Sequence, residues 1–157
     1  MILKKILPIF SFLLILFSNT GVAYSIQPDV FVQSTVNRAA KTLGGNFTKE
    51  ERIEKLKEIA SDTVDIEGIG YYTLGAYRKT INDEQLKEYK ILFSQYFLKS
   101  FSSRLAEYSN PEIEVQSMKK INENYTIVSS ILVATDQRPK VKIDWRIYTK
   151  NPENPKI

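Results

Sequence analysis

Proline and glycine divide this 157-residue chain into two parts that favour different secondary structure. No proline occurs between Pro28 and Pro111, and no glycine follows Gly75. Proline interrupts helices and is poorly tolerated inside sheets, while glycine weakens both kinds of element. The first part is therefore free to form long helices, and the second part carries strand patterns. We predict an α+β domain in which helices precede an antiparallel sheet.

Capping signals mark the expected helices. A first helix is expected over residues 28–43, with proline at its start and two glycines after its end. Thr48 and Glu51 have the spacing of a capping box that opens a second helix. Asp65 is placed to cap a short third helix, and Asn82 to open a long fourth helix. Four helices are therefore expected before residue 109.

Three strands are expected in the second part, because apolar residues recur there at every second position or in dense β-branched runs. They cover residues 113–115, 125–133 and 141–148. Turn-forming residues separate them at 122–124 and 136–139. In the last strand the apolar residues alternate with charged ones, which predicts one buried face. Residues 151–157 read as a turn followed by the start of a further strand.

The first 23 residues have the pattern of a secretory signal peptide. Lys4 and Lys5 precede an apolar run, and small residues end at Ala23, where cleavage is expected. The run is shorter than the roughly 18 residues that a spanning helix needs, and Pro8 interrupts it. An uncleaved N-terminal anchor is the alternative. With cleavage, residues 24–157 form one domain in the periplasm, outside the inner membrane.

The composition excludes several classes of function. The sequence has no histidine and no cysteine, so a Ser-His-Asp triad, a thiol nucleophile and the common zinc sites are ruled out. Without Lys4 and Lys5, 20 basic residues face 18 acidic ones, a net charge of +2. This balance leaves no strongly basic stripe for a nucleic-acid partner. We expect no catalytic residue, no metal and no cofactor.

Half of the 18 aromatic residues lie between Val64 and Tyr108. On a helix, this segment gathers one apolar stripe that consists of Leu86, Tyr89, Phe93, Tyr96, Phe97, Phe101, Leu105 and Tyr108. Ile91, Leu92 and Leu98 make it wider than the stripe of an ordinary surface helix. Such a helix is expected either at the centre of a core or along the wall of a cavity. The strand at 125–133 is apolar on both faces, which suits either a covered sheet or a ligand-binding face.

An ordered series of residues in this region resembles the MlaC family, the toluene-tolerance family of periplasmic phospholipid-binding proteins. The series consists of Asp65, Leu74-Gly75-Ala76-Tyr77-Arg78, Gln85, Tyr89, Phe93, Tyr96 and Leu105-Ala106-Glu107-Tyr108. Residues 138–145, Arg-Pro-Lys-Val-Lys-Ile-Asp-Trp, are similar to a late strand of the family. The resemblance covers essentially all of residues 24–157.

The resemblance implies a monomeric carrier with helices packed on a twisted antiparallel sheet that encloses an apolar lipid cavity. Its implied ligand is a phospholipid. Its implied partners are an outer-membrane lipoprotein complex and an inner-membrane ABC transporter complex, and its implied role is to maintain outer-membrane lipid asymmetry. Family members continue with a further strand, carrying an Asp and a Glu-Gly-(Val/Ile)-Ser stretch, and then a helix. These 157 residues contain neither, so we expect a lipid-binding domain without those two elements.

By position, eight residues are the expected contacts of the lipid tails: Tyr89, Phe93, Phe97 and Phe101 from the long helix, and Ile127, Ile131, Val141 and Ile143 from the sheet. Each of them also suits an ordinary core. Two other functions stay open at this point. One is a small α+β enzyme that uses a carboxylate or a tyrosine in a pocket. The other is an interaction protein whose apolar helix serves only as core.

Overall fold

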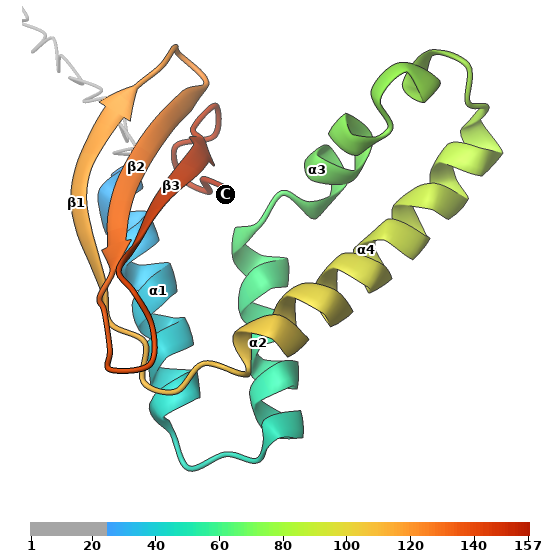
Figure 1. Ribbon diagram of the computed structural model, residues 1–157. Coiled ribbons are helices and arrows are strands. Elements are labelled where there is room, and N and C mark those ends of the chain that lie inside the picture. The colour runs from blue at the N-terminus through green and yellow to red at the C-terminus, as the bar shows by residue number, and fades with distance from the viewer. Residues whose placement is uncertain (1–24) are drawn as a thin grey trace, which may run out of the picture.

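Four α-helices precede a three-stranded antiparallel sheet in the computed structural model, which describes residues 25–157 (Figure 1). The helices are α1 (Pro28–Gly44), α2 (Lys49–Thr63), α3 (Ile66–Thr73) and α4 (Asp83–Leu105), with a short 3₁₀ helix η1 (Gly75–Lys79) before α4. The strands are β1 (Ile113–Lys120), β2 (Tyr125–Leu132) and β3 (Val141–Tyr148). This order confirms the predicted α+β class. The predicted signal peptide and its cleavage site lie outside the described residues.

The predicted helix starts are present with their side-chain caps. The Thr48 side chain accepts a hydrogen bond from the Glu51 amide at 3.2 Å, and the Glu51 carboxylate accepts one from the Thr48 amide at 2.8 Å. Asn82 forms the same reciprocal pair at the start of α4. Asp65 accepts from the Gly68 amide at the start of α3. Local sequence therefore fixes where three of the helices begin.

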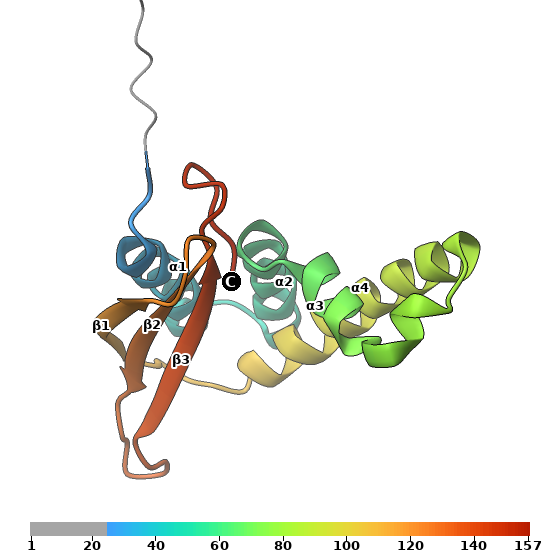
Figure 2. The same ribbon diagram turned by 90° about the horizontal axis from the view of Figure 1, so that it is seen from above.

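Only one face of the sheet is covered by a helix in the described residues. Helix α1 packs against β1 and β2, and α2 packs against α1 and α4. Figures 1 and 2 show that α3 and α4 run side by side away from the sheet, so the molecule has a sheet-and-α1 part and a projecting helical part. Helix α2 lies between these parts and joins them.

The strand register decides which side chains face α1. In the order β1-β2-β3, Val128 of β2 lies opposite Trp145 of β3, and Ser130 lies opposite Ile143. Val128 and Ile147 on this face are fully buried against α1. Ile127 lies on the other face, beside Arg146. The sheet therefore has an inner, apolar face towards α1 and an outer face with charged residues.

The buried apolar residues form two separate clusters rather than one core. One cluster joins α1 to the inner face of the sheet through Val32, Val36, Val128 and Ile147. The other joins α1, α2 and the end of α4 through Leu43, Leu56 and Ala106. Because α1 belongs to both clusters, it connects the sheet to the helices.

The last residues of the chain tie the sheet to the helices a second time. Lys156 pairs with Tyr148 in an isolated antiparallel bridge, at the place where the sequence predicts the start of a further strand. The Ile157 amide donates to the Thr63 carbonyl at 2.8 Å, and the Ile157 carbonyl accepts from the Asp65 amide at 3.0 Å. The segment after β3 thus crosses to the junction between α2 and α3.

Helix α4 differs from the expectation that its broad stripe lies at the centre of a core or along the wall of a cavity, because much of the helix is exposed. Ser102 is its one buried residue, while Ile91, Leu92 and Tyr96 are more than half exposed. The reason is the direction of the helix, because its first half leaves the body of the molecule and has α3 as its neighbour (Figure 1). The stripe therefore passes from one environment to another.

We predict that Thr48→Ala lowers the free energy of unfolding by about 1 kcal/mol, because the first turn of α2 loses its cap. Urea unfolding followed by far-UV circular dichroism measures the change. Glu51→Gln is the control, since glutamine at this position also accepts from the Thr48 amide. A loss as large in the control as in Thr48→Ala contradicts this account.

Candidate functional site

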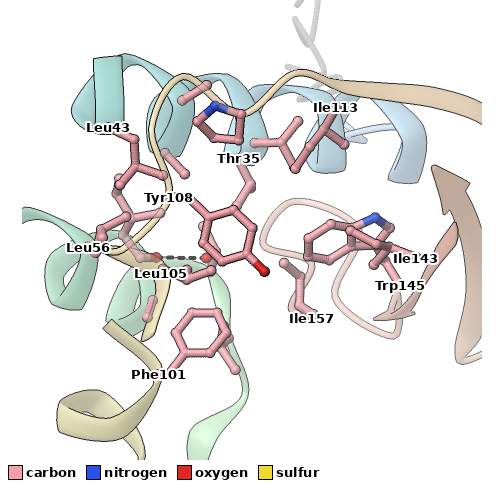
Figure 3. A pocket seen from close by; sticks show the side chains of 18 of the residues that line it. Thr35, Leu43, Leu56, Phe101, Leu105, Tyr108, Ile113, Ile143, Trp145 and Ile157 are labelled. Atoms are coloured by element: carbon pink, nitrogen blue, oxygen red, sulfur yellow. Dashed lines mark hydrogen bonds between the residues drawn. The ribbon is translucent and has the colours of Figure 1, made fainter. Parts of the chain in front are cut away.

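A cavity of about 390 Å³ lies between the two apolar clusters (Figure 3). Its walls come from α1 (Thr35, Val36, Ala39, Ala40, Leu43), α2 and the residue after it (Leu56, Ile59, Ala60, Thr63, Val64), α3 and α4 (Ile69, Phe97, Phe101, Leu105), the segment before β1 (Tyr108, Pro111), and the sheet with the end of the chain (Ile113, Leu132, Ile143, Trp145, Ile157). None of these residues is charged. A volume of this size falls in the range of about 300–1,000 Å³ that is common for ligand pockets.

Most polar groups in the walls are turned away from the cavity. The Thr35 hydroxyl donates to the Phe31 carbonyl at 2.9 Å, and the Thr63 hydroxyl donates to the Ile59 carbonyl at 2.7 Å. Each threonine thus bonds one turn back on its own helix. The Trp145 indole N–H donates to the buried Ser130 hydroxyl at 2.8 Å. These bonds leave an apolar inner surface, which suits hydrocarbon better than water.

Tyr108 is the exception in this wall. No described residue forms a hydrogen bond with its hydroxyl, and in Figure 3 that hydroxyl points towards Ile157. A half-buried tyrosine presents an apolar ring and one polar tip. The cavity therefore contains a single free hydroxyl, and a bound molecule with an oxygen near this point would find a partner.

Three of the eight residues predicted as tail contacts line this cavity: Phe97, Phe101 and Ile143. The rings of Tyr89, Phe93, Phe97 and Phe101 form one stack along α4, with successive centroids 5.8, 6.2 and 5.3 Å apart. The first two rings of the stack lie against α3 instead of the cavity. A side chain on Gly70 would meet the Phe93 ring at 2.7 Å, and the Tyr89 hydroxyl lies 2.7 Å from that of Thr73.

The other predicted sheet residues lie outside the cavity. Ile127 and Ile131 are half-buried on the outer face of the sheet, opposite Arg146 and Lys142 in β3. Val141 is on the inner face at the start of β3, but it is 44% exposed and does not line the cavity. The inner-face position of β2 that does line it is Leu132, which is not among the eight predicted residues.

Sequence reasoning also missed the contributions of α1 and α2. Leu56, Ile59 and Ala60 fall on one face of α2, a pattern that suits any core helix. Ala39 and Ala40 of α1 leave space because their side chains are small. Two adjacent alanines on a helix that is otherwise lined by larger apolar residues were the available sign of a cavity in the sequence, and this sign is weak.

The outer face of the sheet carries one perturbed carboxyl group. The Ser129 hydroxyl donates to Asp144, and this hydrogen bond, together with the nearby Lys142 ammonium group, holds the pKa of Asp144 below its ordinary value of 3.8. Asp144 is exposed on the outer face of the sheet, opposite to the face that lines the cavity, so its ion pair with Lys142 is not part of the site. Residues 25–157 contain no cluster of three or more potential metal ligands. None of their helices is long and apolar enough to cross a bilayer.

Comparisons with known proteins agree on one family and one fold. Residues 32–157 match the family model described as MlaC protein. The intermembrane phospholipid transport system binding protein MlaC of Haemophilus influenzae is 27% identical over 160 residues, which cover 96% of this chain and 75% of that relative. A phospholipid-binding protein from Ralstonia solanacearum, solved in complex with a phospholipid, matches with a TM-score of 0.67 at 15% identity. That match covers 83% of this chain and 75% of the other, and it shows a shared fold.

We predict that Ser130→Ala lowers the free energy of unfolding by about 1–3 kcal/mol, because the Trp145 indole N–H loses its partner inside the protein. Urea unfolding followed by circular dichroism gives the value. Ser129→Ala is the matched control on the outer face of the same strand, where a loss below about 0.5 kcal/mol is expected. Equal losses in the two variants would show that the buried hydrogen bond has no special weight.

The same two variants also test the hydrogen bond from Ser129 to the Asp144 carboxylate, and here Ser130→Ala is the control. Ser129→Ala is expected to raise the pKa of Asp144 towards 3.8, because the hydrogen bond to the charged form is lost. Since the pKa is lowered by folding, the contribution of this bond to stability is present above pH 3.8 and disappears as the pH falls through the lowered pKa. Carboxyl-carbon NMR titration follows Asp144 directly. Ser130→Ala should leave this pKa unchanged, and a rise in that variant would refute the assignment.

Proposed function

The chain belongs to the MlaC family, and from this premise we propose that it is a phospholipid-binding carrier that moves lipids between membranes. One observation carries the proposal, namely the cavity of about 390 Å³ with no charged residue in its wall. The relative from Haemophilus influenzae is named as the binding protein of an intermembrane phospholipid transport system. Binding and releasing a lipid requires no bond to be made or broken.

The energetics favour an apolar container over a tight binding site. Exposure of hydrocarbon to water costs about 0.8 kcal/mol per CH₂ group, on the order of 20 kcal/mol for two acyl tails. Transfer of the tails from a bilayer into an apolar cavity avoids most of this cost and gains little beyond it. A carrier therefore has to keep the tails dry during transit, and it has to release them again. The hydrogen-bonded threonines and tryptophan of the wall serve this requirement.

Among the residues predicted to contact the tails, the proposed site keeps Phe97, Phe101 and Ile143, which line the cavity. Leu132 and Trp145 join them from the inner face of the sheet. Tyr89 and Phe93 continue the same stack of rings along α4 and extend the apolar surface beyond the cavity. The proposed site leaves out Ile127 and Ile131, which lie on the outer face, and Val141 at the start of β3.

The family membership and the N-terminal pattern support a proposal for the location and the partners of the chain. We place the chain in the periplasm, with residues 1–23 as a cleaved signal peptide and residues 24–157 as the lipid-binding domain. Its partners in this proposal are an inner-membrane ABC transporter complex and an outer-membrane lipoprotein complex. Exchange of lipid between them would support the asymmetry of the outer membrane.

Organic extraction of the purified protein, followed by mass spectrometry, tests the proposal. We expect phospholipid close to one molecule per chain. A chain that carries no lipid after expression and takes none from phospholipid vesicles would overturn the carrier function. It would leave the interaction protein as the better explanation, while turnover of an added lipid or ester would favour the enzyme.

Phe101→Asp tests the position of the site. The substitution places a carboxylate against the proposed tails, and we expect bound lipid to fall at least about tenfold, because burying a charge without a partner is costly. Leu92→Asp is the control, since Leu92 is an apolar residue of the same helix, 56% exposed and outside the cavity. Circular dichroism of both variants separates lost binding from lost folding. An equal decrease in two folded variants would refute the assignment.

A further inference from the structure

A second, smaller pocket adjoins the cavity at Tyr108. Its volume is about 70 Å³, and it shares Tyr108, Pro111 and Leu132 with the large cavity. It lies where the turn between β2 and β3 meets the segment between α4 and β1. Its lining is mixed, and unlike that of the large cavity it includes charged side chains, namely Glu112 and Arg138.

Arg138 has an unusual position for an arginine in a turn. Arg138 is half-buried, and its guanidinium carbon lies 4.3 Å from the centroid of the Tyr108 ring. Its backbone pairs with Thr135 in the turn, which fixes where the side chain starts. No carboxylate of the described residues forms a salt bridge with it. Its five N–H donors are thus available beside the large apolar cavity.

The chemistry of these donors selects the kind of group that fits. A guanidinium group is planar and permanently charged, and its fork matches two oxygens of a phosphate. The carboxylate in the small pocket is that of Glu112, which is exposed and therefore screened by water and salt. The half-buried arginine is screened less, so the attraction for an anion should dominate.

We propose that Arg138 binds the phosphate of the phospholipid headgroup, while the acyl tails pass Tyr108 into the large cavity. This inference rests on the proposed carrier function. It assigns a binding residue to the headgroup of the lipid, for which the apolar cavity offers no charged partner. Tyr108 lines both pockets, and its free hydroxyl suits the ester oxygens between phosphate and tails. Recognition would therefore read the phosphate and not the group beyond it.

The protein contains a matched control for this arginine. Arg146 lies over the ring of Tyr125 with its guanidinium carbon 4.2 Å from the centroid, nearly the same contact as in the Arg138–Tyr108 pair. It belongs to the outer face of the sheet and lines neither pocket. Loss of this arginine removes a cation–π contact of nearly the same distance without touching the proposed site.

The experiment offers the protein two lipids with the same tails. The purified chain and its variants are incubated with non-ionic detergent micelles that hold equal amounts of dioleoylphosphatidylglycerol and dioleoylglycerol, and mass spectrometry gives the ratio of the bound lipids. We expect the wild type to prefer the phosphate-bearing lipid. In Arg138→Gln the ratio should fall about tenfold, because hydrogen bonds to a charged group are lost. In Arg146→Gln it should stay within about twofold of the wild type.

The outcomes separate this inference from the carrier function. A wild type that takes up both lipids without preference overturns the role of Arg138 and leaves the carrier function intact, and this measurement needs no variant to fold. The role of Arg138 is also overturned if Arg138→Gln keeps the wild-type ratio, or if Arg146→Gln loses the preference equally. A wild type that takes up neither lipid overturns the carrier function itself.

Discussion

An apolar cavity in a domain of this size is stable only if its walls leave almost no polar group without a partner, because each unpaired buried group costs free energy. Thr35 and Thr63 meet this condition by bonding to carbonyls of their own helices. Trp145 meets it across the sheet, through the Ser130 hydroxyl. These bonds keep the wall apolar, and without them its polar groups would need water or other partners inside the cavity.

The residues around the cavity also have to be held in place by contacts elsewhere, because the cavity occupies the space where a single hydrophobic core would otherwise pack. The two buried clusters stand on either side of it, and α1 belongs to both. The bonds of Ile157 to Thr63 and Asp65 join the end of the chain to the α2–α3 junction, so the sheet and the helices are connected at a second place. A ligand in the cavity would supply the packing contacts that the separated clusters lack, and its binding would then stabilise the folded state.

The fold was largely readable from the sequence, whereas the site was readable only in part. Caps at Thr48, Asp65 and Asn82 are local signals, and they predicted the helix starts correctly. The choice between the two faces of β2 is not local, because both faces are apolar and a shift of one residue exchanges them. Packing of α1 on β1 and β2 decides it in favour of Val128 and Leu132. Likewise, the stripe on α4 gave no sign that it divides between α3 and the cavity.

Arg138 and Arg146 show most clearly why a site needs more than a local contact. Each lies over a tyrosine ring at nearly the same distance, and neither forms a salt bridge with a described residue. Arg146 is exposed on the outer face, where water competes for its donors. Arg138 is half-buried beside a ring that also lines an apolar chamber. The half-buried environment of Arg138 strengthens a hydrogen bond to a charged group and limits the size of the group that fits beside it. Position in the fold, and not the arginine–tyrosine contact, therefore determines which arginine is suited to bind a lipid phosphate.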